Sequence, residues 1–301
     1  MSGRDESAGQ EGLAELAERF EAHRGRLRAV AYRMLGSPSE ADDAVQEAWI
    51  RLSRADASSI ISLESWLRTV VSRLCLDMLR SRAARREEPL EWHEPAGAPA
   101  GEPEHEAELI DSVGRAMLVV LGRLAPAERV AFVLHDMFAV PFDQIAPIVG
   151  RNVVATKKLA SRARGRVRGA VVPDPGLARQ RQVVEAFLAA ARSGDLTALL
   201  TVLAPDVVRH ADPAVLQPGG QALVRGADAV ARQTLVLGPR ARYAEPALVD
   251  GAVGAVVAPH GRLLLVLAIT VHDDRIAEYD VIADPARLRR LNLTVPGWAA
   301  R

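Results

Sequence analysis

The stretch Phe142–Gly169, FDQIAPIVGRNVVATKKLASRARGRVRG, decides how the first half of this chain is interpreted. A short apolar segment is followed by a glycine and then by a segment rich in cations, and no acidic residue occurs between Asp143 and Asp174. This order predicts two helices joined by a tight turn, the second of which faces phosphates and base edges. The basic residues of the stretch are Arg151, Lys157, Lys158, Arg162, Arg164, Arg166 and Arg168.

Local signals place the turn and the start of the second helix. Gly150 permits the turn, and Asn152 can cap the helix that follows. Pro147 is tolerated best near a first turn, so the first helix should begin near Asp143. Early side chains of a recognition helix reach base edges, and later ones hold phosphates. The predicted DNA contacts are Arg151, Thr156, Lys157, Lys158, Ser161, Arg162 and, on phosphates, Arg164.

Composition bounds the class of protein. The chain has 301 residues, of which 49% are hydrophobic and 25% charged, which is typical of a soluble globular protein with two or three domains. Its 38 basic and 38 acidic residues cancel, but they are segregated along the first half, which predicts separate partners for separate faces. Cys75 is the only cysteine, so an intrachain disulfide or a cysteine metal cluster cannot form, and its apolar surroundings predict burial.

Targeting signals are not predicted. The first residues are polar and acidic, unlike a signal peptide, and the longest apolar run, Leu263–Val271, is too short to cross a bilayer. We therefore expect a cytoplasmic protein.

Hydrophobic periodicity divides the chain into four segments. Apolar residues at three- and four-residue spacing predict a helical domain over 10–86, with a break at Gly36–Ser39. A proline- and glutamate-rich linker is expected at 87–108, the helix-turn-helix domain at 109–172, and a C-terminal domain at 177–296. The last should hold two helices joined at Gly194-Asp195 and then strands at Asp206–Ala211, about Ala247–Ala258, Arg262–His272 and Arg275–Ile282.

Two helices of opposite charge follow one another in the first segment. The first of the two predicted helices has an acidic outer face over apolar residues, in the stretch GSPSEADDAVQEAWIRL. The next helical run is basic: after Glu64 it contains six arginines and a single acidic residue, Asp77. A strand-opening protein needs cations along the phosphates and a pocket or aromatic surface for a flipped base. Arg68 and Arg73 suit the first task, while Trp66 could serve the second or belong to the core.

These ordered motifs resemble a sigma factor of the extracytoplasmic-function (ECF) group over about residues 13–170. The resemblance implies that Asp42, Asp43, Gln46 and Glu47 dock on the coiled-coil clamp of the largest subunit of core RNA polymerase. It also implies that the loop 54–65 and the basic helix, through Trp66, Arg68, Arg73 and Arg80, open and hold the minus-ten strand. The helix-turn-helix would then read the minus-thirty-five element of promoter DNA.

The C-terminal segment resembles the SnoaL-like branch of the NTF2-like fold, an α+β cone. The combination is similar to the ECF41 group, also called SigJ-like, in which the fused domain modulates the sigma factor and no separate anti-sigma factor is expected. Partial counterparts of that group's motifs occur at 92–95, at Asp212 with Gly219-Gly220, and at 284–288. The candidate ligand or interdomain contacts are His210, Asp212, Asp284, Pro285 and Leu288.

Two other functions stay open at this point. A free-standing helix-turn-helix regulator that responds to a small ligand would explain residues 142–169 but not the acidic and basic helices before them. An NTF2-like enzyme with a DNA-binding appendage would need an acid–base pair such as His210 and Asp212, which share a face if both lie on one strand. Since the sequence has no nucleotide loop, metal-ligand spacing or nucleophile elbow, we predict no enzyme, cofactor or metal.

Overall fold

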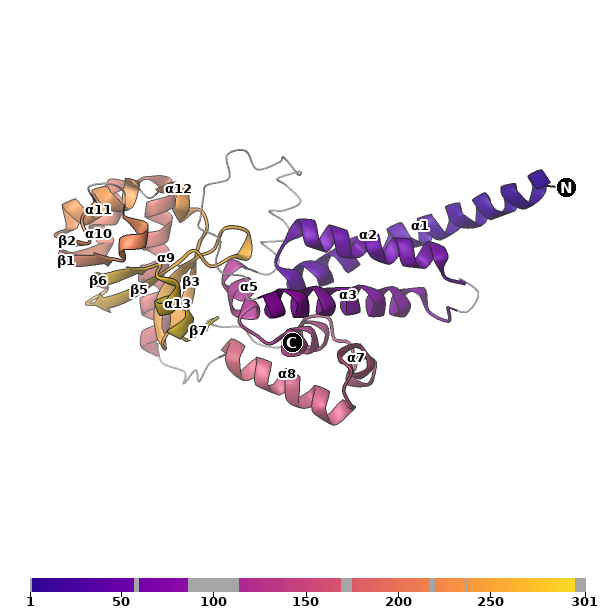
Figure 1. The fold of residues 1–301 in the computed structure, drawn as a ribbon. Helices are drawn as coiled ribbons and strands as arrows, with labels where there is room; N and C mark the ends of the chain where they lie inside the picture. Colours follow the sequence, from indigo (N-terminus) through magenta and orange to yellow (C-terminus); the bar gives the residue numbers. More distant parts are fainter. Residues whose placement is uncertain are drawn as a thin grey trace. The chain divides into compact units, whose positions relative to one another are not determined.

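A computed structural model describes residues 2–56, 60–85, 114–168, 175–216, 220–236 and 238–295. The predicted linker at 87–108, the motif at 92–95 and Gly219 lie outside these residues. The chain forms two compact units, one of residues 1–109 with 124–163 and the other of residues 110–123 with 164–299 (Figure 1). Among the described residues, no helix is both long and apolar enough to cross a membrane.

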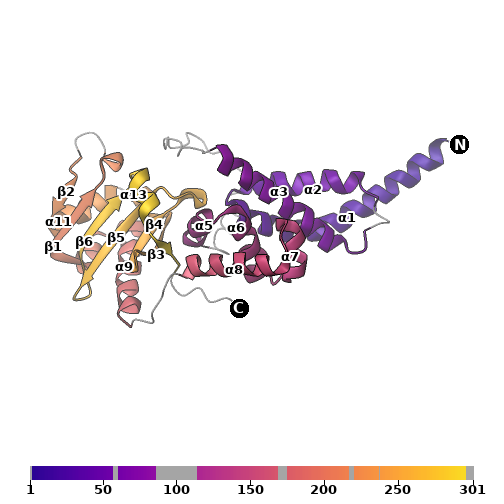
Figure 2. The ribbon, with the colours of Figure 1, turned by 60° about the horizontal axis from the view of Figure 1, so that its bottom comes forward.

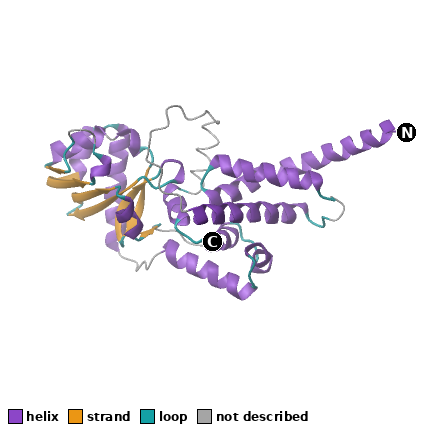
Figure 3. Ribbon diagram, in the orientation of Figure 1, coloured by secondary structure: helices purple, strands orange, loops and turns teal. Residues whose placement is uncertain are grey.

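The described part of the first unit is helical (Figure 3). Helices α1 and α2 pack on each other and on α3, and they bury the predicted apolar positions, including Leu27, Val30 and Met34. Ser37 lies in the predicted break at Gly36–Ser39 and caps α2 by accepting a hydrogen bond from the Glu40 backbone. The elements are α1 (Ser2–Leu35), α2 (Pro38–Arg54), α3 (Leu63–Arg85), α6 (Pro126–Phe132), the π-helical turn η2 (Val133–Met137), α7 (Phe142–Val149) and α8 (Val153–Arg168), whose last turns belong to the second unit.

The second unit is a mixed α+β fold, which confirms the predicted fold class. Its seven-stranded sheet has the order β2-β1-β6-β5-β4-β3-β7, with β1 and β6 parallel and the other neighbours antiparallel. Helix α9 covers one face, where Phe187 packs on Tyr279 (Figure 2). The strands are β1 (Leu203–Ala211), β2 (Leu223–Arg225), β3 (Ala244–Val249), β4 (Ala252–Val257), β5 (Leu265–His272), β6 (Arg275–Ile282) and β7 (Leu293–Thr294).

Helices complete the second unit. Gly194, with a φ of +73°, ends α9, and the Asp195 side chain caps α10, as the sequence predicted. The helices are α5 (Arg115–Gly122), α9 (Pro175–Ser193), α10 (Leu196–Val202), α11 (Ala227–Val236), α12 (Gly238–Ala241) and α13 (Pro285–Arg290).

The prediction of one strand over residues 247–258 is wrong. The structure has a hairpin there, because Asp250 and Gly251 adopt φ values of +50° and +91° and reverse the chain between β3 and β4. An Asp-Gly pair between apolar runs is the usual signal for such a turn. The apolar residues on both sides concealed it, since burial of both faces removes the alternation that marks a strand end.

Candidate functional site

The helix-turn-helix is formed by α7 and α8 with the predicted turn between them. Gly150 has a left-handed φ of +66° and ends α7, and the Asn152 Oδ1 accepts a hydrogen bond from the Ala155 backbone at 2.8 Å. Pro147 lies inside α7, which begins at Phe142. The turn thus fixes where the second helix starts and which residues belong to its first turns.

Helix α8 has one buried stripe and one cationic stripe. Buried side chains recur at Ala160, Ala163 and Val167, and these hold the helix against the protein. The exposed stripe includes the predicted DNA contacts Lys157, Lys158, Ser161 and Arg162. Residues three and four apart share a helix face, so these four side chains lie on one broad face of α8. Arg151 is exposed in the turn before α8, and Arg164 is half-buried.

The prediction that Thr156 contacts DNA is corrected by its burial. Thr156 is fully buried, and its hydroxyl donates to the Asn152 carbonyl at 2.9 Å. It precedes Ala160 by four residues and therefore belongs to the buried stripe. The sequence signal for burial of Thr156 is its spacing of four and seven residues from Ala160 and Ala163. The prediction of DNA contact instead followed from its place early in a cationic helix.

The cations of α3 have partners within the first unit. Arg68 donates from Nη2 to the Gln144 Oε1 at 2.7 Å, and Arg73 donates from Nη2 to the Pro147 carbonyl at 3.3 Å. Both acceptors lie on α7 of the helix-turn-helix. Arg80 is exposed, with its Nη1 3.6 Å from an oxygen of Asp77, and the predicted minus-ten residue Trp66 is partly exposed.

The four residues predicted to bind polymerase lie along α2. Asp43 and Gln46 are exposed, and Glu47 pairs with Arg51 at 3.0 Å one helical turn away. Asp42 pairs with Arg28 of α1 at 2.7 Å, and its side chain is 48% exposed. An exposed pair such as Glu47–Arg51 contributes at most about 1 kcal/mol, so Glu47 can exchange its partner for a cationic surface at low cost.

A buried arginine lies where α6 packs against α1 and α3. Arg129 is 5% exposed; its Nη2 donates to the Arg33 carbonyl at 3.4 Å, and its Nε has no hydrogen-bond partner in the described part of the chain. Burial lowers the pKa of Arg129 to about 9, and nearby Arg82 acts in the same direction. Burial also raises the pKa of the neighbouring Cys75 thiol to about 12. This packing therefore holds a poorly solvated cation, which costs free energy.

His210 and Asp212, predicted to share a strand face, take different roles. His210 is exposed on β1, whereas Asp212 lies just past the strand and is 7% exposed. The Asp212 Oδ2 accepts hydrogen bonds from the backbones of Ala283 and Asp284, both at 3.0 Å, and Arg287 donates to Oδ1. Burial alone would raise the pKa of Asp212, but these donors hold it below its ordinary value. Asp212 thus ties β1 to the segment after β6.

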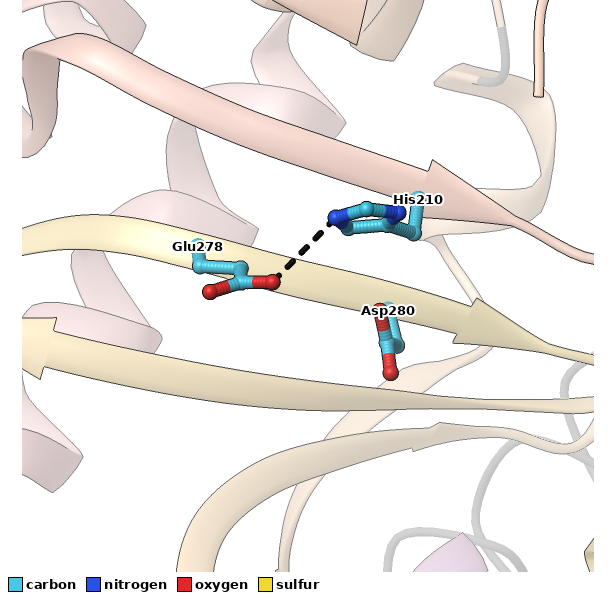
Figure 4. A group of neighbouring side chains, drawn as sticks. All are labelled: His210, Glu278 and Asp280. Atoms are coloured by element: carbon cyan, nitrogen blue, oxygen red, sulfur yellow. Dashed lines mark ion pairs between the residues drawn. The ribbon is translucent and has the colours of Figure 1, made fainter. Parts of the chain in front are cut away.

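A hollow of about 250 Å³ lies beside this network, lined among others by His210, Asp280 and Arg287. His210, Glu278 and Asp280 project from one face of the neighbouring strands β1 and β6, and the His210 Nε2 lies 3.2 Å from the Glu278 Oε1 (Figure 4). One nitrogen and two carboxylates could ligate a divalent cation. However, the Arg287 Nη2 lies 3.8 Å from the Asp280 Oδ2 and already supplies a positive charge.

The remaining C-terminal candidates form a helix start. The Asp284 side chain caps α13 by accepting from the Arg287 backbone at 2.8 Å, and Pro285 occupies the first turn. Leu288 is buried, and its carbonyl accepts a hydrogen bond from the Arg123 Nη2 at 2.7 Å. Arg123 follows α5, so this region contacts the end of that helix.

Helix α5 is held at both ends within the second unit. The Glu245 Oε2 accepts from the Ala116 backbone at 3.0 Å, and the Glu245 Oε1 lies 3.3 Å from the Arg115 Nη1. All six residues from Ala116 to Leu121 are buried. A carboxylate at a helix N-terminus is stabilising, so Glu245 of β3 fixes the start of α5.

The sequence did not predict that two apolar side chains near the proposed DNA contacts would be exposed. Ile61, between α2 and α3, has full exposure, and Val154 in the first turn of α8 is 65% exposed. Val154 precedes Lys157 and Lys158 by three and four residues, so helical spacing alone could have placed it on their face.

Comparisons with known proteins match both halves of the chain. The family model described as Sigma-70 region 2 matches residues 19–85, and the one described as Sigma-70, region 4 matches residues 114–167. "ECF RNA polymerase sigma factor SigJ" of Mycobacterium tuberculosis is 40% identical over 88% of this chain and 91% of its own length. "Probable ECF RNA polymerase sigma factor SigI" of the same species is 38% identical over 92% of this chain and 96% of its own. The crystal structure of that SigJ aligns at 36% identity over 91% of this chain and 98% of the other, with a TM-score of 0.45.

Changing Asp212 to Asn should destabilise the second unit by about 2 kcal/mol at pH 7, because hydrogen bonds to a buried charge are lost. A carboxylate whose pKa is lowered by folding stabilises above its unfolded value, here 3.8, and that contribution disappears as the pH falls through the folded pKa. The difference in unfolding free energy between the unchanged chain and Asp212→Asn should therefore shrink below about pH 4. Denaturant unfolding at several pH values tests this. Asp206→Asn, an exposed position on β1, is the control and should change stability by less than about 0.5 kcal/mol. A deficit that persists unchanged at pH 2 would contradict the account.

Proposed function

We propose residue roles from one premise: the chain belongs to the ECF RNA polymerase sigma factors. It therefore acts in transcription initiation, binding core polymerase and directing it to specific promoters. One observation supports separate surfaces for polymerase and for DNA, namely the opposite charge of two exposed helix faces. Acids line α2, and cations line α8.

The acidic face of α2 is the proposed docking surface for core polymerase. Asp43 and Gln46 are exposed, Glu47 pairs with the exposed Arg51, and Asp42 pairs with the half-buried Arg28. A complementary cationic surface would both steer the encounter and replace those partners.

Reversing the charge of Asp43 and Glu47 to lysine should weaken binding to core polymerase at least about tenfold and reduce initiation in parallel, since like charges then meet. Affinity for fluorescently labelled core polymerase and run-off transcription measure the two effects. Glu185→Lys is a matched control, because Glu185 makes an equivalent pair with Arg181 four residues away on α9. Unchanged core binding by the double variant would contradict the docking assignment.

The basic elements are the proposed DNA contacts. The exposed stripe of α8 suits the major groove of the minus-thirty-five element, and α3 with the preceding loop suits the opened minus-ten strand. Fully exposed Ile61 in that loop offers an apolar surface against an unstacked base. This assignment makes DNA binding strongly dependent on salt.

The contacts of α3 with α7 require the first unit to open before it can bridge a promoter. The two elements are separated by roughly 25 base pairs, about 85 Å of B-DNA. In the structure, Arg68 and Gln144 are in hydrogen-bond contact. These contacts cannot persist when α3 and α7 are that far apart, so we assign the packed arrangement to a closed state that polymerase and DNA replace.

Arg129→Met should stabilise the closed state, because it removes a buried, poorly partnered cation from the packing of α6. A stabilisation of about 1.4 kcal/mol would lower the open fraction, and hence initiation, about tenfold. Thermal unfolding and run-off transcription check this. Arg129→Lys keeps a charge and should initiate more like the unchanged protein. A higher melting temperature with undiminished initiation would show that Arg129 does not govern opening.

We further propose that the C-terminal domain regulates the sigma factor through α5. The region 4 match begins at residue 114 and so includes α5, yet Glu245 and the carbonyl of Leu288 hold this helix within the second unit. Such regulation within one chain fits the expectation of no separate anti-sigma factor. A small ligand near His210 stays a prediction, and we place the function in the cytoplasm with no catalytic turnover.

Glu245→Ala should loosen α5 and shift initiation in the same direction as removal of the residues after Val172, because both changes release that helix. Run-off transcription from one promoter compares the two proteins. The control is Glu185→Ala, which should leave initiation unchanged, because Glu185 forms an ion pair with Arg181 on the same helix α9. Opposite shifts, or an effect of truncation that Glu245→Ala does not share, would count against control through α5.

A further inference from the structure

Val154 is an exposed apolar residue on the cationic face of α8. Its relative exposure is 65%, although valines that belong to the core of this element are fully buried, as Val167 is. Val154 precedes three exposed residues by three, four and seven positions and therefore lies on the same stripe of the helix. These residues are Lys157, Lys158 and Ser161. The side chain therefore contributes nothing to packing of the helix and points where the DNA-binding cations point.

The position of Val154 in α8 favours contact with bases. Asn152 caps the helix, so Val154 is the second helical residue. N-terminal residues of a recognition helix contact base edges in the major groove. Valine offers no hydrogen bond, and its branched side chain has one strongly preferred rotamer in a helix, so it presents a rigid apolar surface.

The major groove offers such a surface only one apolar partner, the C5-methyl group of thymine. We propose that Val154 reads a thymine of the upstream promoter element through that methyl group. This rests on the proposed function, and it adds a specificity-determining residue to it. An apolar protein partner fits this face less well, because Lys157 and Lys158 interrupt any continuous apolar patch.

The test removes the methyl group and the side chain separately and together. Promoters are first selected from a random library with the full chain and core polymerase, and the upstream element is read from the selected sequences. Each thymine of that element is then replaced singly by deoxyuridine, which lacks only the methyl group. Promoter binding by the holoenzyme is measured for the unchanged chain and for Val154→Ala.

At one thymine, deoxyuridine should weaken binding by the unchanged chain about fourfold, the effect of exposing one buried carbon group. The same replacement should have no effect on Val154→Ala, because the partner side chain is already missing. Val236→Ala is the matched control: Val236 is 63% exposed on α11, and its variant should respond to deoxyuridine as the unchanged chain does. Since Val154 is exposed, its variant should keep the melting temperature of the unchanged chain.

Three results would overturn the proposal. Deoxyuridine effects that are equal in the unchanged chain and in Val154→Ala at every thymine would show that residue 154 reads no methyl group. A selected upstream element without a preferred thymine would do the same. If the library yields no initiation at all, the proposed function fails first, and the assignment of Val154 fails with it.

Discussion

The hydrogen bonds from Arg68 and Arg73 to α7 constrain this molecule, because they hold the basic helix α3 against the first helix of the helix-turn-helix. Both side chains donate hydrogen bonds to α7 in the structure. The arginines that we propose for the opened DNA strand therefore contact the helix-turn-helix instead. We propose that promoter binding exchanges these contacts for contacts with phosphates, so that the two elements lie together in the free chain and separate on the promoter. The buried Arg129 makes the packed arrangement less stable than an apolar contact would, which keeps the exchange accessible.

The proposed regulation by the second unit depends on α5. The six residues Ala116–Leu121 of α5 are apolar and buried, so this helix needs a surface to pack on. Glu245 and Arg123 fix its two ends to that unit. The start of region 4 is thus attached to the fused domain, and this attachment is the route that we propose for its regulation.

Much of the first unit could be predicted from the sequence because its signals are local. Gly150 and Asn152 act on residues within one helical turn, and each takes its predicted place. Thr156 failed because its role depends on what covers that face of α8. The contacts of Arg68 with Gln144 and of α5 with Glu245 join residues 76 or more positions apart, so no spacing rule could reveal them. The hairpin at Asp250-Gly251 was hidden by apolar residues on both sides.

The exchange of partners by the α3 arginines is the central claim, and a distance change tests it most directly. Because Cys75 is the only cysteine, a Cys75→Ser chain can carry dyes at Asp77→Cys on α3 and Asp143→Cys on α7, two exposed positions. Energy transfer between the dyes is measured for the free protein and for its complex with core polymerase and promoter, after confirming that the labelled protein initiates transcription. The account predicts high transfer in the free protein and a large loss in the promoter complex. Equal transfer in both states, in a complex that initiates, would contradict it.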